Sequence, residues 1–215
     1  KKKVLDAQCG SGRLLVTLAQ RGLQVHGADA SAAMLAACEQ RLIGASVQAL
    51  LFRQDLTNLN LCFRYAAAFM ANGSFQAFAT ARDAQRVLQR LKAHLVPPGL
   101  LLLDLYVPYP AMHPPAAPLV EIRTASLADG SRITLRTETL VHADARRLDI
   151  TTRYEKRSTK GVLDREDGKN SLCWYEASDI TELLARNGFT DIAIEPSPIV
   201  DDLDRRFAVR ARRAP

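Results

Sequence analysis

Apolar blocks separated by polar and glycine-containing turns run through the first half of the chain. Val4 and Leu5 begin a short strand, and a turn with two glycines joins it to a helix over residues 13–21. Ser31 is a natural N-cap for a second helix. Further strands are predicted over residues 24–29, 47–52, 65–70 and 100–106, and a third helix over residues 80–94. Because strands that alternate with helices form parallel sheets covered on both faces, the pattern predicts an α/β fold.

The pattern changes near Pro108, where prolines become frequent. Residues 121–156 then alternate apolar and polar side chains around an Asp129-Gly130 dipeptide, a hairpin signal. A further strand is expected over residues 162–175. One face of this small antiparallel sheet is expected to carry Ile122, Ile133, Leu135, Leu148 and Ile150.

The α/β pattern returns after the antiparallel segment. Ser178 is expected to cap a helix that ends at Gly188, and two strands over residues 189–195 and 206–212 close the chain. The antiparallel segment is therefore predicted to be an insertion that forms a lid. The domains are predicted as residues 1–107 together with 176–215, and the inserted lid as residues 108–175.

Length and composition fit one globular domain with an insertion. The chain has 215 residues, of which 47% are hydrophobic and 24% are charged. No apolar run approaches the ~20 residues that a membrane-spanning helix needs, and no signal peptide is recognised. Since the sequence opens on Lys1 rather than methionine, we expect residues upstream of it.

The cysteines and the charge of the chain bear on its metal content, its compartment and its binding partners. The cysteines at positions 9, 38, 62 and 173 are widely scattered and form no C-x-x-C pair, which argues against a zinc site or a disulfide framework. We therefore expect no metal and a reducing compartment, the cytoplasm. The net charge of +6 is concentrated at the ends of the chain. Aromatic residues are not interleaved with these basic residues, so we expect solvated surface rather than a nucleic-acid interface.

Three acids end the first three predicted strands: Asp6, Asp29 and Asp55. In an open α/β sheet, ligands bind outside the carboxyl ends of the strands. Gly10 and Gly12 lie between the first strand and the helix, whose N-terminus favours a polar or anionic ligand group. A nicotinamide cofactor is one alternative, but its motif needs a third glycine where this chain has Leu15.

The chain resembles the class I S-adenosylmethionine-dependent methyltransferases, which have a Rossmann-like, doubly wound sheet. Their opening motif, two hydrophobic residues followed by D-x-G-x-G-x-G, matches Val4 to Gly12 except at Gln8. Later motifs lie at residues 25–35, 54–56 and 72–75, and residues 95–104 resemble L-x-P-G-G-x-L-x-x-D. The inserted sheet is similar to that of small-molecule N-methyltransferases of the glycine/sarcosine and aminosugar type.

The resemblance implies a role for each cofactor-binding residue. Asp6 is expected to orient the ammonium group of S-adenosylmethionine, and Asp29 to hold the ribose hydroxyls. Asn72 is expected beside the sulfonium. The adenine is expected to contact Asp55, the amide of Leu56 and the side chain of Met34. The remaining residues assigned to this site are Gln8, Cys9, Gly10, Gly12 and Ala30.

Candidate catalytic residues are Tyr106, His113 and Tyr154, which lie after the fifth strand and within the insertion. No dedicated base is required, because methyl transfer depends mainly on alignment and on exclusion of water. The acceptor is expected to be a small molecule, with an amine among the candidates. The oligomeric state stays open, with a homodimer as one alternative.

Gln8 motivates a second alternative, a cofactor-binding module with weak catalysis. If the turn keeps left-handed geometry at Gln8, strain of about 1–3 kcal/mol is expected there. We therefore expect weaker cofactor binding than the motif usually gives.

Overall fold

The chain forms two β-sheets in a computed structural model that describes residues 2–159, 161–196 and 204–214. The larger sheet has seven strands in the order β10-β11-β5-β4-β1-β2-β3. These strands are β1 (Lys3–Ala7), β2 (Gln24–Asp29), β3 (Leu50–Arg53), β4 (Tyr65–Met70), β5 (Leu95–Val107), β10 (Phe189–Pro196) and β11 (Arg205–Arg213). β11 runs antiparallel to the other six strands of this sheet, which are parallel to one another. The predicted α/β class, mostly parallel with one C-terminal antiparallel strand, is confirmed.

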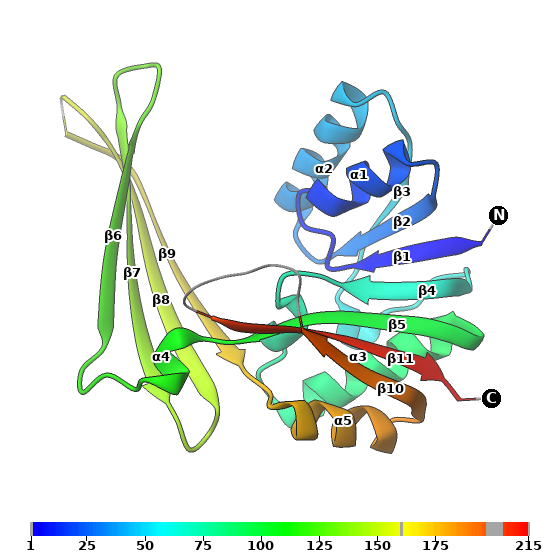
Figure 1. The fold of residues 1–215 in the computed structure, drawn as a ribbon. Coiled ribbons are helices and arrows are strands. Elements are labelled where there is room, and N and C mark those ends of the chain that lie inside the picture. The colour runs from blue at the N-terminus through cyan, green and yellow to red at the C-terminus, as the bar shows by residue number, and fades with distance from the viewer. Residues whose placement is uncertain (1, 160, 197–203, 215) are drawn as a thin grey trace.

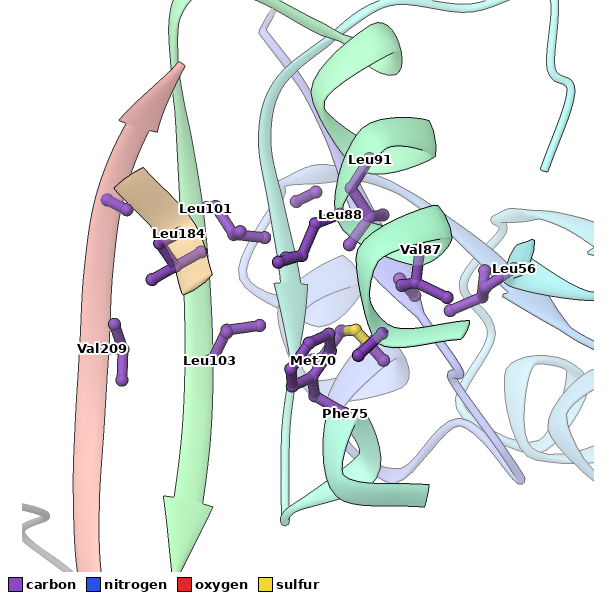
Figure 2. Packing of buried hydrophobic residues seen from close by; sticks show 14 of the residues in the cluster. Leu56, Met70, Phe75, Val87, Leu88, Leu91, Leu101, Leu103, Leu184 and Val209 are labelled. Carbon is purple, nitrogen blue, oxygen red and sulfur yellow. The ribbon is translucent and has the colours of Figure 1, made fainter. Parts of the chain in front are cut away.

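Helices cover both faces of this sheet (Figure 1). They are α1 (Arg13–Gln20), α2 (Ala32–Gly44), α3 (Ala81–His94) and α5 (Ala177–Arg186), with short turns α4 (Tyr109–Met112), η1 (Leu56–Asn58) and η2 (Ser74–Ala77). Apolar residues of α1 and α2 pack with Phe69 on one face. On the other face, Leu88 and Leu91 of α3 meet Met70 and Leu101 of the sheet (Figure 2). No helix in the described ranges is long and apolar enough to span a membrane.

Three predicted element boundaries are wrong. The prolines at positions 97 and 98 do not separate α3 from the fifth strand, because β5 begins at Leu95 and runs through them. Proline φ suits an extended strand, and the pairing with β4 is irregular at this point, between Tyr65 and Ala67. Helix α5 is capped by Glu176 rather than Ser178, in a reciprocal capping box with Asp179. The third strand starts at Leu50 instead of residue 47.

The second sheet is antiparallel and stands beside the carboxyl ends of the parallel strands (Figure 1). Its four strands are β6 (Leu119–Ser126), β7 (Arg132–His142), β8 (Arg147–Ser158) and β9 (Gly161–Cys173). The pairing places Ile133, Leu135, Leu148 and Ile150 on one face, as predicted. Ile122 is an exception, because it pairs with Arg136 and therefore lies on the opposite face, where it is exposed.

Gln76, a fully buried residue of η2, joins the two sheets. Its Nε2 donates to the backbone oxygens of Tyr106 and Cys173, both at 2.9 Å, and its Oε1 accepts from the amide of Tyr106 at 2.9 Å. Tyr106 lies where the chain leaves the larger sheet, and Cys173 lies where the chain returns from the smaller one. One side chain therefore fixes both connections of the insertion.

Candidate active site

A pocket of about 610 Å³ opens at the carboxyl ends of β1 and β4. These neighbouring strands mark the point where the order of the parallel strands reverses, which is the usual ligand site of an open α/β sheet. Six residues predicted from the sequence line the pocket: Asp6, Gln8, Cys9, Gly10, Met34 and Asn72. The structure thus brings together residues from the first, second and fourth motifs.

The loop after β1 is held by the Asp29 carboxylate. One oxygen accepts from the amide of Gly10 at 2.8 Å, and the other accepts from the amide of Ser31 at 2.8 Å. Ser31 in turn caps α2, because its hydroxyl accepts from the amide of Met34 at 3.2 Å. Asp29 therefore connects the glycine loop to the start of α2, and each oxygen keeps a lone pair for a ligand hydroxyl.

Gly12 serves packing rather than the pocket. It precedes α1 with φ of 78°, a left-handed conformation that favours glycine. A β-carbon there would overlap the sulfur of Cys38 on α2. The structure does not place Gly12 in the pocket lining, so its contribution is to let α1 approach α2 closely.

Asp6 is the buried acid of the pocket. Burial, and secondarily the nearby Asp29 carboxylate, raise the pKa of Asp6 to about 7. Among the described residues, no side chain or amide donates a hydrogen bond to its carboxylate. Because an ammonium group would favour the charged form, this buried acid is suited to a cationic ligand group.

The residues predicted for the adenine are only partly in the pocket. Met34 lines it, while Ala30, Asp55 and Leu56 do not. Asp55 caps η1, accepting from the amide and hydroxyl of Thr57 at 2.8 and 2.9 Å. The side chain of Leu56 is buried in the core, which leaves its backbone as the part able to contact a ligand.

Asp104, which was not predicted from the sequence, supports the turn at the edge of the pocket. Its carboxylate accepts from the amide of Asn72 at 2.8 Å, and its backbone oxygen accepts from the amide of Gly73 at 2.9 Å. These bonds hold Asn72 at φ of 56°, beside the pocket. The final aspartate of the L-x-P-G-G-x-L-x-x-D motif was the available signal.

Tyr106 does not line the pocket but packs behind the Asn72-Gly73 turn. Its ring packs against Gly73, where a β-carbon would overlap it, and Arg206 lies 4.9 Å from the ring centroid. Burial first, and Asp204 second, raise the pKa of Tyr106, while Arg206 opposes them. The phenol is therefore neutral at physiological pH, and it can donate a hydrogen bond but not act as a base.

The other two candidate catalytic residues lie apart from Tyr106. His113 is exposed and packs on Tyr109, with ring centroids 4.8 Å apart. Tyr154 is on β8, on the same face as Leu148, and is 46% exposed. In the described part of the chain, no hydrogen bond or ring contact joins Tyr106, His113 and Tyr154. They do not form a preassembled catalytic group.

Six lining residues were not predicted: Ser11, Arg13, Leu14, Thr17, Ala71 and Ser74. Four of them belong to the loop before α1 or to its first turns. The motif predicts where this loop and helix lie, but it does not specify their side chains. Ser74 follows Gly73 in the Asn-Gly-Ser-Phe stretch, and its position after β4 was the available signal.

The lining suits a ligand with an amino-acid end. Asp6 supplies a buried anion, the Gly10 loop supplies backbone, and Gln8 supplies a side-chain oxygen that is buried without a partner. Met34 adds an exposed apolar surface for a flat ring. These residues fit S-adenosylmethionine, whose parts are an amino acid, a sulfonium and a nucleoside. Within the described residues, no cluster of histidine, cysteine or acidic side chains could hold a metal ion.

A family model described as a methyltransferase domain matches residues 4–99, which include β2 to β4, nearly all of β1 and every residue that lines the pocket. This segment of the chain is a methyltransferase domain. The predicted resemblance to a methyltransferase family is therefore confirmed for this segment.

Two curated relatives extend this match. A protein named as a methyltransferase from Geobacillus sp. (strain WCH70) is 26% identical over 196 residues, covering 90% of this chain and 76% of that protein. A dTDP-3-amino-3,6-dideoxy-alpha-D-glucopyranose N,N-dimethyltransferase from Streptomyces fradiae is 30% identical over 101 residues. That alignment covers 47% of this chain and 38% of the relative.

The fold of this chain is similar to that of a solved structure. The sugar N-methyltransferase KedS8 from Streptoalloteichus sp ATCC 53650 superposes with a TM-score of 0.79 at 19% identity. The comparison covers 100% of this chain and 81% of that one. Both sheets are therefore included in the shared architecture.

The nicotinamide alternative is not supported. Leu15, at the position of the missing third glycine, is fully buried against α2 and β2. A β-carbon on Gly27 of β2 would overlap Leu15. The close approach of helix and strand is thus obtained with a glycine on the strand instead of the helix.

Proposed function

We propose that this methyltransferase transfers a methyl group from S-adenosylmethionine to an amine of a small molecule. The observation that carries the proposal is the pocket at β1 and β4, where a buried acid without a hydrogen-bond donor lies beside the Asp29-held loop. The sequence match to an aminosugar N,N-dimethyltransferase supports an amine as acceptor.

The residues of this site bind and orient rather than react. When bound, S-adenosylmethionine supplies a methyl group on a positively charged sulfur. In the proposal, Asp6 pairs with the ammonium, Asp29 holds the ribose hydroxyls, and Asn72 presents its side-chain oxygen near the sulfonium. Tyr106 supports the Asn72-Gly73 turn from behind and keeps its proton. An acceptor amine must arrive neutral, with its lone pair aligned with the methyl carbon.

Thermal denaturation with added ligands tests the proposal. S-adenosylmethionine and S-adenosylhomocysteine are expected to raise the melting temperature, and NAD is not. Transfer of a labelled methyl group to a panel of aminosugars is then compared with transfer to the matched sugars that carry hydroxyl in place of amine. Stabilisation by NAD alone, or equal labelling of both sugar sets, contradicts the proposal.

The smaller sheet is proposed to cover the acceptor. Its four strands stand beside the pocket end of the larger sheet (Figure 1). The face that carries Leu148, which is buried against the main core, also carries Tyr154 farther along β8. This face offers apolar and hydroxyl groups to a small molecule. The lid remains proposed as residues 108–175.

We expect this lid to open more readily than the parallel sheet. Every residue of β6 is exposed, whereas β1 and β4 are largely buried. Amide hydrogen exchange is therefore expected to be faster in β6 and β7 than in β1 and β4, and to slow when S-adenosylhomocysteine and an acceptor are both bound. Equal protection of the two sheets in the free protein is the opposite outcome.

A cytoplasmic location is part of the same proposal. All four cysteines are free thiols, two of them buried. A small-molecule acceptor rather than nucleic acid fits a pocket that is lined by one arginine, Arg13, and no lysine. The oligomeric state is left to sedimentation measurements.

A further inference from the structure

Two polar side chains of the pocket are left without partners. Within the described residues, the Oε1 atom of Gln8 and the hydroxyl of Ser74 are buried and have no hydrogen-bond partner. Both residues line the same pocket, Gln8 from the loop after β1 and Ser74 from the turn after β4. Buried polar atoms in native proteins are nearly always paired, so two orphans in one pocket point to a ligand.

Gln8 is also held in an unfavourable backbone conformation. Its φ is 64°, in the left-handed region that residues with a β-carbon avoid. In the family motif this position is a glycine, for which the conformation carries no strain. The protein keeps a strained residue here, and its buried side-chain oxygen has no hydrogen-bond partner among the described residues.

The position of Gln8 in the pocket indicates which end of the cofactor it contacts. Gln8 follows Asp6, the acid proposed for the ammonium, by two residues and lines the pocket with it, whereas Met34, proposed for the adenine, lines the pocket from α2. An amide offers one acceptor and two donor hydrogens, and a hydroxyl offers both functions. The amino-acid end of S-adenosylmethionine carries donors on its ammonium and acceptors on its carboxylate, which matches this set.

We propose that Gln8 is a positioning residue that hydrogen-bonds the amino-acid end of the cofactor, and that Ser74 adds a second contact from the β4 side. The inference rests on the proposed function of the pocket. The replacement of the motif glycine by Gln8 then has two effects. It strains the backbone, and it adds a ligand contact that a glycine cannot make.

Two ligands separate contact from strain. S-adenosylhomocysteine has the amino-acid end, and 5′-methylthioadenosine lacks it but keeps the nucleoside and sulfur. Calorimetry is used to measure both dissociation constants for the wild type, Gln8→Met and Gln8→Gly. Gln8→Met keeps the β-carbon and its strain but loses the amide, whereas Gln8→Gly loses the amide and relieves the strain. A lower preference in both variants therefore reports the lost contact rather than a change in strain. In both variants the preference for S-adenosylhomocysteine over 5′-methylthioadenosine is expected to fall about tenfold.

Further variants complete the test. Ser74→Ala is expected to lower the same preference about three- to tenfold. Gln24→Met, at an exposed position at the start of β2, is the matched control and is expected to leave both affinities unchanged. An unchanged preference in both Gln8 variants overturns the role of Gln8, and an unchanged preference in Ser74→Ala overturns that of Ser74. Failure of the wild type to bind either ligand instead contradicts the proposed function.

Discussion

Replacing Asp29 with alanine is expected to weaken S-adenosylhomocysteine binding by about a hundredfold or more. The substitution removes the proposed ribose contact. It also removes the two hydrogen bonds, each 2.8 Å long, that the carboxylate accepts from the amides of Gly10 and Ser31. Hydrogen bonds to a charged group contribute about 1.5–3 kcal/mol each. The glycine loop loses its tie to α2, so the affinity falls for two reasons at once. Calorimetry measures the loss.

A ligand analogue separates these two reasons. In the wild type, S-adenosylhomocysteine without its ribose 2′-hydroxyl is expected to bind about tenfold less tightly than the intact compound. In Asp29→Ala the two compounds are expected to bind equally, because the partner of that hydroxyl is gone. Glu39→Ala, an exposed position on α2, serves as control. If the analogue is penalised equally in wild type and Asp29→Ala, the carboxylate holds the loop but does not contact the ribose.

The sequence predicted which residues of the loop after β1 line the pocket, because this part of the pocket is local in the chain. A strand, a turn and the first turn of a helix lie within about ten residues, so Asp6, Gly10 and Gln8 are placed by short-range geometry alone. Ser31 capped its helix as expected, because a capping hydroxyl needs only an amide three residues ahead. Asp29 followed from its position at a strand end. Its hydrogen bonds to the amides of Gly10 and Ser31, which join the loop to α2, could not be predicted without the fold.

Long-range pairing explains what the sequence missed. The exposed side of Ile122 depends on the register of β6 against β7, and a one-residue offset moves a side chain to the other face. Asp104 reaches Asn72 across the β4–β5 pair, a contact between residues 32 positions apart. The candidate catalytic residues were chosen by residue type and by their place after the fifth strand or within the insertion, which does not determine where their side chains lie. For that reason Tyr106, His113 and Tyr154 came from three separate places in the fold.

Stability and cofactor affinity are both expected to depend on the ionisation of Asp6. Its pKa is raised to about 7 in the folded protein, by burial first and Asp29 second, from 3.8 without these effects. Between these values the folded state binds the proton and the unfolded state does not. Stability contributed by this group therefore falls as pH rises from about 4 to about 7, by up to about 4 kcal/mol. Asp6→Asn is expected to remove this dependence and to unfold at higher urea than wild type at pH 8.

Cofactor binding is expected to depend on pH in the opposite direction. An ammonium group beside Asp6 requires the carboxylate, so binding below pH 7 must release the proton that Asp6 holds. The affinity for S-adenosylhomocysteine is expected to fall up to about tenfold for each pH unit below 7. Titrations in two buffers that differ in ionisation enthalpy report the released proton directly. Asp6→Asn is expected to bind weakly at every pH and to release no proton. A wild-type protein whose affinity and proton release are constant from pH 6 to 8 excludes Asp6 as the partner of the ammonium.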